Sequence, residues 1–104
     1  MANQTFKIYV DKPALEKFAL HLEFLANISE QAATKLHNAY AESLAILESF
    51  PRACPAYISH LYPQREFRSR IFGKRYRIVF EILGNEIYVF DIQDCRQDYD
   101  KHLI

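Results

Sequence analysis

Residues 66–93, EFRSRIFGKRYRIVFEILGNEIYVFDIQ, contain three runs of β-forming residues separated by two glycine-led dipeptides. Gly73-Lys74 and Gly84-Asn85 fit two-residue hairpin turns, because glycine readily takes the positive φ that such turns need. The sequence therefore predicts strands at 66–72, 75–83 and 86–93, joined as an antiparallel meander.

The chain before this meander has a different hydrophobic period. Residues 5–10 alternate apolar side chains and predict a first strand, and two stretches of helical spacing follow. Asp11 and Pro13 mark the start of a helix that runs to about Ala26, and Ser29 caps a second helix that ends before Pro51. A link this short predicts an antiparallel helical hairpin. We expect one α+β domain over residues 1–104, ordered β-α-α-β-β-β, with the hairpin on one face of a mainly antiparallel sheet and a loop at 51–63.

Composition narrows the functional classes. The chain has 104 residues, 50% of them hydrophobic, and a formal net charge of zero, so a nucleic-acid partner would have to meet a local basic patch. Cys54 and Cys95 match no metal-ligand spacing and are expected to be reduced thiols of a cytoplasmic protein. No apolar run has the roughly 20 residues of a membrane span, and the first residues are unlike a signal peptide. We expect a soluble protein with no metal, no cofactor and no membrane partner.

Two-residue turns also fix an expected register for the sheet. Arg70 then faces Arg77, Phe72 faces Arg75, and Phe80 faces Val89. The face toward the helices would carry Phe67, Ile71, Ile78, Phe80, Ile82, Ile87 and Val89. The opposite face would carry Arg68, Arg70, Arg75, Arg77 and Arg96, beside Val79, Tyr88 and Phe90.

This arginine face has two interpretations. It is an ordinary solvated face, whose charges are screened by Glu66, Glu81, Glu86 and Asp94. Alternatively, its clustered guanidinium groups bind a phosphate backbone, which arginine recognises well through paired hydrogen bonds. Physical reasoning from the residues leaves both open.

The stretch Arg75–Ile82, RYRIVFEI, is similar to the central strand motif of RelE/ParE superfamily toxins. Phe50-Pro51 and the run Arg68–Gly73 before it resemble the family's proline-containing loop and first basic strand. The run Ile87–Ile92 and then Arg96–Tyr99 resemble its last strand and Arg-Asp ending. The order and spacing of these short motifs carry the resemblance, which covers nearly the whole chain.

The resemblance implies the toxin of a type II toxin–antitoxin system, neutralised by a cognate antitoxin encoded beside it. RelE-like members are metal-independent endoribonucleases that cut messenger RNA on the ribosome. ParE-like members are not nucleases but bind and poison DNA gyrase. A third hypothesis is an inactive module that only binds the antitoxin.

For a RelE-like nuclease, the resemblance assigns Arg77 to stabilising the phosphate in the transition state. It assigns Arg68 and Arg70 to binding the RNA backbone, and Arg75 on the same predicted face is a further RNA- or anion-binding candidate. It adds Arg96 and Tyr99 as catalytic candidates, with His102 as another candidate for proton transfer. Such chemistry needs a base, a cation and an acid. The neutral net charge and the extended helical hairpin favour the ParE-like gyrase inhibitor instead, with the loop at 51–63 as a protein-contact surface.

Overall fold

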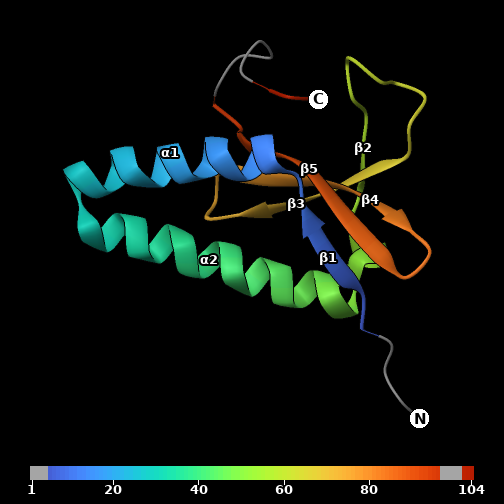
Figure 1. The fold of residues 1–104 in the computed structure, drawn as a ribbon, viewed down its shortest axis with the longest axis horizontal. Helices are drawn as coiled ribbons and strands as arrows, with labels where there is room; N and C mark the ends of the chain where they lie inside the picture. The colour runs from blue at the N-terminus through green and yellow to red at the C-terminus, as the bar shows by residue number, and fades with distance from the viewer. Residues whose placement is uncertain (1–4, 97–101) are drawn as a thin grey trace.

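The computed structural model describes residues 5–96 and 102–104 and shows a five-stranded sheet with two helices on one face (Figure 1). In chain order the elements are β1 (Lys7–Val10), α1 (Lys12–Ile28), α2 (Glu30–Ser49), the 3-10 turn η1 (Pro51–Ala53), β2 (Ala56–Tyr57), β3 (Phe67–Phe72), β4 (Tyr76–Leu83) and β5 (Glu86–Asp94). The strands lie in the order β1-β5-β4-β3-β2, with β1 parallel to β5 and the other neighbours antiparallel. The predicted α+β fold is confirmed, and the loop at 51–63 also contains η1 and the short β2.

The two helices begin and end close to the predicted positions. Ser29 caps α2, where its hydroxyl oxygen accepts the backbone N–H of Ala32 at 3.2 Å. Asp11 occupies the N-cap position of α1, but its side chain makes no capping hydrogen bond. Neither helix in the described part of the chain is long and apolar enough to cross a membrane.

The core lies between the helices and the sheet and is centred on four aromatic rings. Phe18 of α1 packs 4.8 Å from Tyr40 of α2, measured between ring centroids, and both contact Phe72 of β3. Tyr76 of β4 completes the cluster, 5.6 Å from Phe72. Burying a phenylalanine side chain contributes about 1.5–3 kcal/mol, so this cluster holds the hairpin against the sheet.

The turn between β3 and β4 has three residues rather than two, so the predicted register of this hairpin is wrong. Phe72 faces Tyr76 instead of Arg75, and Arg70 faces Ile78 instead of Arg77. Gly73 and Lys74 both take positive φ, and Arg75 stays in the turn, where its carbonyl oxygen accepts the N–H of Cys95. A shift of one residue moves every side chain of β3 to the other face.

A β-bulge also changes the end of β5. Phe80 faces Val89 as predicted, but Val79 faces Asp91, so Phe90 is the extra residue of the bulged strand. Beyond the bulge the alternation is reversed: Asp91 and Gln93 lie on the face away from the helices. Asp94 faces Tyr76.

The three-residue turn and the bulge determine which side chains lie on the predicted face of the sheet. Ile78, Phe80, Ile82, Ile87 and Val89 pack in the helix-side core, as predicted. Phe67 lies on the opposite face, buried with Val79 and Ile104, and the Ile71 side chain is 47% exposed. We call this opposite side of the sheet the open face.

Candidate functional site

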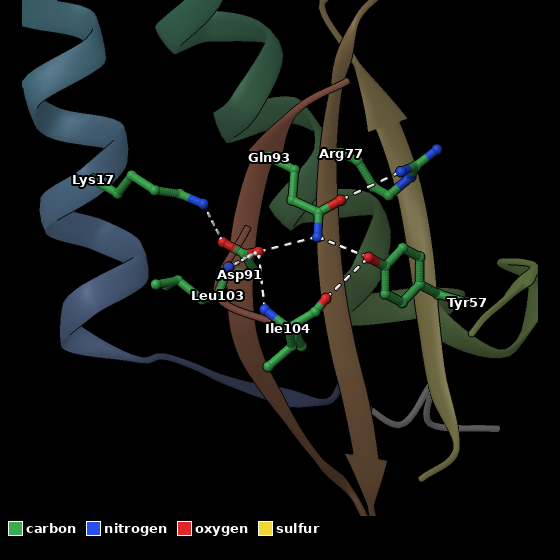
Figure 2. Close-up of polar contacts among 7 residues, drawn as sticks. All are labelled: Lys17, Tyr57, Arg77, Asp91, Gln93, Leu103 and Ile104. Atoms are coloured by element: carbon green, nitrogen blue, oxygen red, sulfur yellow. Dashed lines mark hydrogen bonds and ion pairs between the residues drawn. The ribbon is translucent and has the colours of Figure 1, made fainter. Parts of the chain in front are cut away.

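Arg77 is the predicted site residue that the structure places on the open face. It lies on β4 directly opposite Gln93 of β5, and its Nη1 donates to Gln93 Oε1 at 3.3 Å (Figure 2). Its guanidinium stands 5.5 Å from the ring centroid of Tyr57, which β2 brings to the same place. The side chain is half-buried, so it is held in one orientation and still reaches solvent.

A buried carboxylate organises the surroundings of Arg77. Asp91 is fully buried, and its Oδ1 pairs with Lys17 Nζ of α1 at 2.5 Å. Its Oδ2 accepts Gln93 Nε2 at 3.0 Å and the backbone N–H of Leu103 at 2.7 Å, as Figure 2 shows. Asp91 therefore ties α1, β5 and residues 102–104 together.

Gln93 and Tyr57 connect this carboxylate to the arginine. Gln93 Nε2 also donates to the Tyr57 hydroxyl at 2.9 Å, and that hydroxyl donates to the Ile104 carbonyl oxygen at 3.0 Å. Ile104 in turn packs on Phe67 and Val79. The open face beside Arg77 is thus partly covered by the chain's own residues, and the hydrogen bonds fix the arginine from one side.

Arg68 and Arg70 do not join Arg77, which corrects the prediction of a single arginine face. With β3 shifted by one residue, both point to the helix side of the sheet. Arg68 Nη1 donates to the Cys54 carbonyl oxygen at 2.7 Å and thereby holds the end of η1. Arg70 Nε donates to Ser43 Oγ of α2 at 3.2 Å.

Arg75 and Arg96 lie away from Arg77, at the end of the sheet beneath α1. Arg75 Nη2 donates to the Tyr76 hydroxyl at 3.2 Å, and this hydroxyl shares a short hydrogen bond with His21 Nε2 of α1. Arg96 was expected on the open face, but the bulge in β5 leaves it beside Asp94, with 3.7 Å between Nε and Oδ1. Burial lowers the pKa of His21; Asp94 opposes the shift, while Arg75 and Arg96 add to it.

Tyr99 lies outside the described residues, whereas His102 lies within them. His102 is half-buried, and burial lowers its pKa; the Asp91 charge opposes this shift, and Lys17 and Arg77 add to it. A histidine with a lowered pKa is neutral near pH 7 and can accept a proton. The structure thus brings a candidate base into the electrostatic field of Arg77.

Sequence reasoning missed Asp91, Gln93, Tyr57 and Lys17 as parts of this site. A signal for two of them was present, because Asp91 and Gln93 are polar residues two apart in a strand and must share a face. No comparable signal marks Tyr57, which reaches the site only because β2 pairs with β3, or Lys17, whose partner is distant in sequence.

Comparison with known proteins adds independent information. The model of the family described as the ParE toxin of the type II toxin–antitoxin system parDE matches residues 8–99, which is most of the chain. A search of the curated proteins found no match.

Proposed function

Because this chain belongs to the family of ParE toxins of type II toxin–antitoxin systems, we propose that it arrests growth by binding DNA gyrase and not by cutting RNA. Membership in the family implies a cognate antitoxin that neutralises it. The choice between the two activities rests on where the arginines lie.

The observation that carries this proposal is the dispersal of the predicted RNA-binding set. Arg68 and Arg70 are held on the helix side by Cys54 and Ser43. A guanidinium whose donors are occupied by the protein's own carbonyl or hydroxyl groups has fewer left for phosphate oxygens. Of the five arginines expected on one face, Arg77 is the one that the described residues place there, and this supports recognition of a protein surface over an RNA strand.

A second candidate, RNA cleavage, is favoured by one specific observation. His102 precedes Leu103, whose N–H binds Asp91, and Gln93 connects the same Asp91 to Arg77. A cation and a neutral base together are two of the three groups that phosphodiester cleavage needs. In that mechanism His102 would take the proton of the 2′-hydroxyl and Arg77 would stabilise the charge that develops on phosphorus oxygens.

Induced expression in a bacterial host separates these functions. Growth arrest with gyrase-linked DNA breaks and intact messages supports the proposal. Arrest with new RNA ends inside translated codons contradicts it and supports the nuclease. Absence of arrest contradicts both and leaves an antitoxin-binding module.

Two variants sharpen the test. Arg77→Ala should abolish arrest by either route while the protein stays folded. His102→Gln should leave gyrase poisoning within about twofold but remove RNA cleavage, because only cleavage uses a base. Lys12→Ala, which removes one positive charge at an exposed side chain of α1 outside this network and outside the loop at 51–63, is the matched control and should arrest growth like the unmodified protein.

A further inference from the structure

A groove lies between the helical hairpin and the β3–β4 turn, away from the Arg77 network. Its volume is about 430 Å³. Leu25 of α1 and Leu36 and Ala39 of α2 contribute an aliphatic floor, and Lys35, Lys74 and Arg75 provide the charged rim. We call this feature the tip groove.

The charge of the tip groove is one-sided. Three cations line it, and no carboxylate belongs to the described residues that form it. The whole chain has a formal net charge of zero, so this is a local concentration of positive charge. Lys35 and Lys74 are exposed, and the potentials of neighbouring like charges add in a concave site bounded by apolar walls.

Arg75 adds a donor that the described protein atoms do not satisfy. Its Nη2 is bound to the Tyr76 hydroxyl, but its Nε is buried and has no hydrogen-bond partner there. A buried donor without a partner is destabilising by about 1–3 kcal/mol.

The turn that carries Lys74 is held in an uncommon conformation. Gly73 has φ +56°, a conformation that favours glycine, and a Cβ at this position would lie 2.8 Å from Leu36 Cδ1, so the end of the Leu36 side chain would have to move. Lys74 itself has φ +73°, a region that non-glycine residues seldom occupy. Such strain persists where the surrounding structure enforces it, often at binding sites. Here it places a lysine at the rim of the groove.

The floor and the rim together favour one kind of ligand. Stacked nucleobases favour aromatic platforms, but the described floor is aliphatic, and the neighbouring Tyr76 ring is only 4% exposed. Aliphatic side chains fit this floor, and carboxylates match the rim cations. We propose that the tip groove binds an acidic, leucine-rich or isoleucine-rich segment of the antitoxin. The identity of the partner rests on the proposed function, whereas the ligand chemistry rests on the groove alone.

The ligand chemistry is tested with defined probes. The peptide acetyl-Leu-Glu-Leu-Glu-Leu-Glu-amide is titrated into the ¹⁵N-labelled chain, and its glutamine counterpart is the neutral control. The acidic peptide should shift the amide signals of Lys35, Gly73 and Lys74, with at least about tenfold higher affinity than the neutral one. Equal affinity of the two peptides, or tighter binding of an oligouridylate at the same amides, would overturn the proposal.

Charge reversal tests the role of the rim. The double variant Lys35→Glu/Lys74→Glu should weaken binding of the acidic peptide at least about tenfold. Lys7→Glu/Lys12→Glu changes the net charge equally at exposed lysines outside the groove, so its affinity should stay within about twofold. Circular dichroism spectra of both variants should match that of the unmodified protein and serve as the check that they are folded. Similar affinities for both folded variants would refute the role of the rim.

The identity of the partner is tested in cells. Expression of Lys35→Glu/Lys74→Glu should still arrest growth, but co-expressed antitoxin should no longer restore it, while the control variant is rescued. Equal rescue of both would overturn the assignment to the antitoxin. If the unmodified chain causes no arrest, the proposed function fails, and the peptide titration still decides the ligand chemistry.

Discussion

Replacing Asp91 with asparagine should destabilise the fold far more than a change of one atom suggests. Asp91 Oδ1 accepts Lys17 Nζ, and Oδ2 accepts donors from Gln93 and Leu103. An asparagine has one oxygen and one NH₂ group, so either orientation places a donor against a donor. The variant also leaves the Lys17 ammonium without its buried counter-charge.

The magnitude follows from the burial of the two partners. Breaking a buried ion pair by removing one partner costs about 3–5 kcal/mol. The Lys17 side chain is 28% exposed and can turn toward water, so the lower end applies, about 3 kcal/mol. For a domain of this size, each kcal/mol lowers Tm by about 4–8 °C, which predicts a fall of about 12–24 °C.

Urea denaturation and calorimetry measure this loss, with Asp11→Asn as the matched control. Asp11 is exposed and makes no side-chain cap hydrogen bond, so its variant should stay within about 0.5 kcal/mol of the unmodified protein. A double-mutant cycle with Lys17→Met should give a coupling energy of about 0.5–3 kcal/mol. A loss below about 1 kcal/mol for Asp91→Asn, or no coupling, would refute the central role of this carboxylate.

Three further predictions concern the faces, the histidine and the thiols. Phe80→Ala removes a fully buried ring and should cost about 3–5 kcal/mol in urea denaturation, whereas Ile71→Ala should cost about 0.5 kcal/mol or less; equal losses would contradict the observed register. Burial holds the pKa of His21 in the folded protein below 6.5. The neutral His21 side chain therefore contributes its full stability above that pH, and this contribution is lost as the pH falls through the lower, folded-state pKa. Denaturation curves recorded from about pH 7 down to about pH 5 should therefore show a smaller pH dependence for His21→Gln, and an unchanged slope would argue against this shift. Iodoacetamide should modify the exposed Cys95 before Cys54, which is buried and whose thiol pKa is raised by burial, and mass spectrometry would expose the opposite order.

The sequence predicted those parts of the fold that depend on local chemistry. Ser29 is a good capping residue wherever a helix follows it, and α2 begins there. Gly84-Asn85 forms the expected two-residue turn, so Leu83 faces Glu86 and the register of β4 and β5 near the turn is as predicted. In both places a short stretch contains all the information that the structure uses.

The register of β3 was not predictable in this way, because the strand carries apolar residues at both parities. Phe67 and Ile71 favour one face and Phe72 the other, so alternation alone gives no answer. Packing decides: Phe72 joins Phe18 and Tyr40 in the helix-side core, and Phe67 finds a separate apolar cluster with Ile104. The bulge at Phe90 was not predictable from the sequence either, because many residue types can be the extra residue of a bulged strand.

Arg77 kept its predicted face for a physical reason that Arg68 and Arg70 lack. It lies on β4 beside Ile78, and Ile78 and Phe80 are both fully buried on the helix side. Alternation within β4 therefore forces Arg77 outward, whatever register β3 adopts. The orientation of Arg68 and Arg70 depended on the length of one turn. The core therefore fixes the orientation of Arg77. A broad arginine face would have needed a two-residue turn between β3 and β4. This difference favours a compact protein contact around Arg77 over a long phosphate-binding surface.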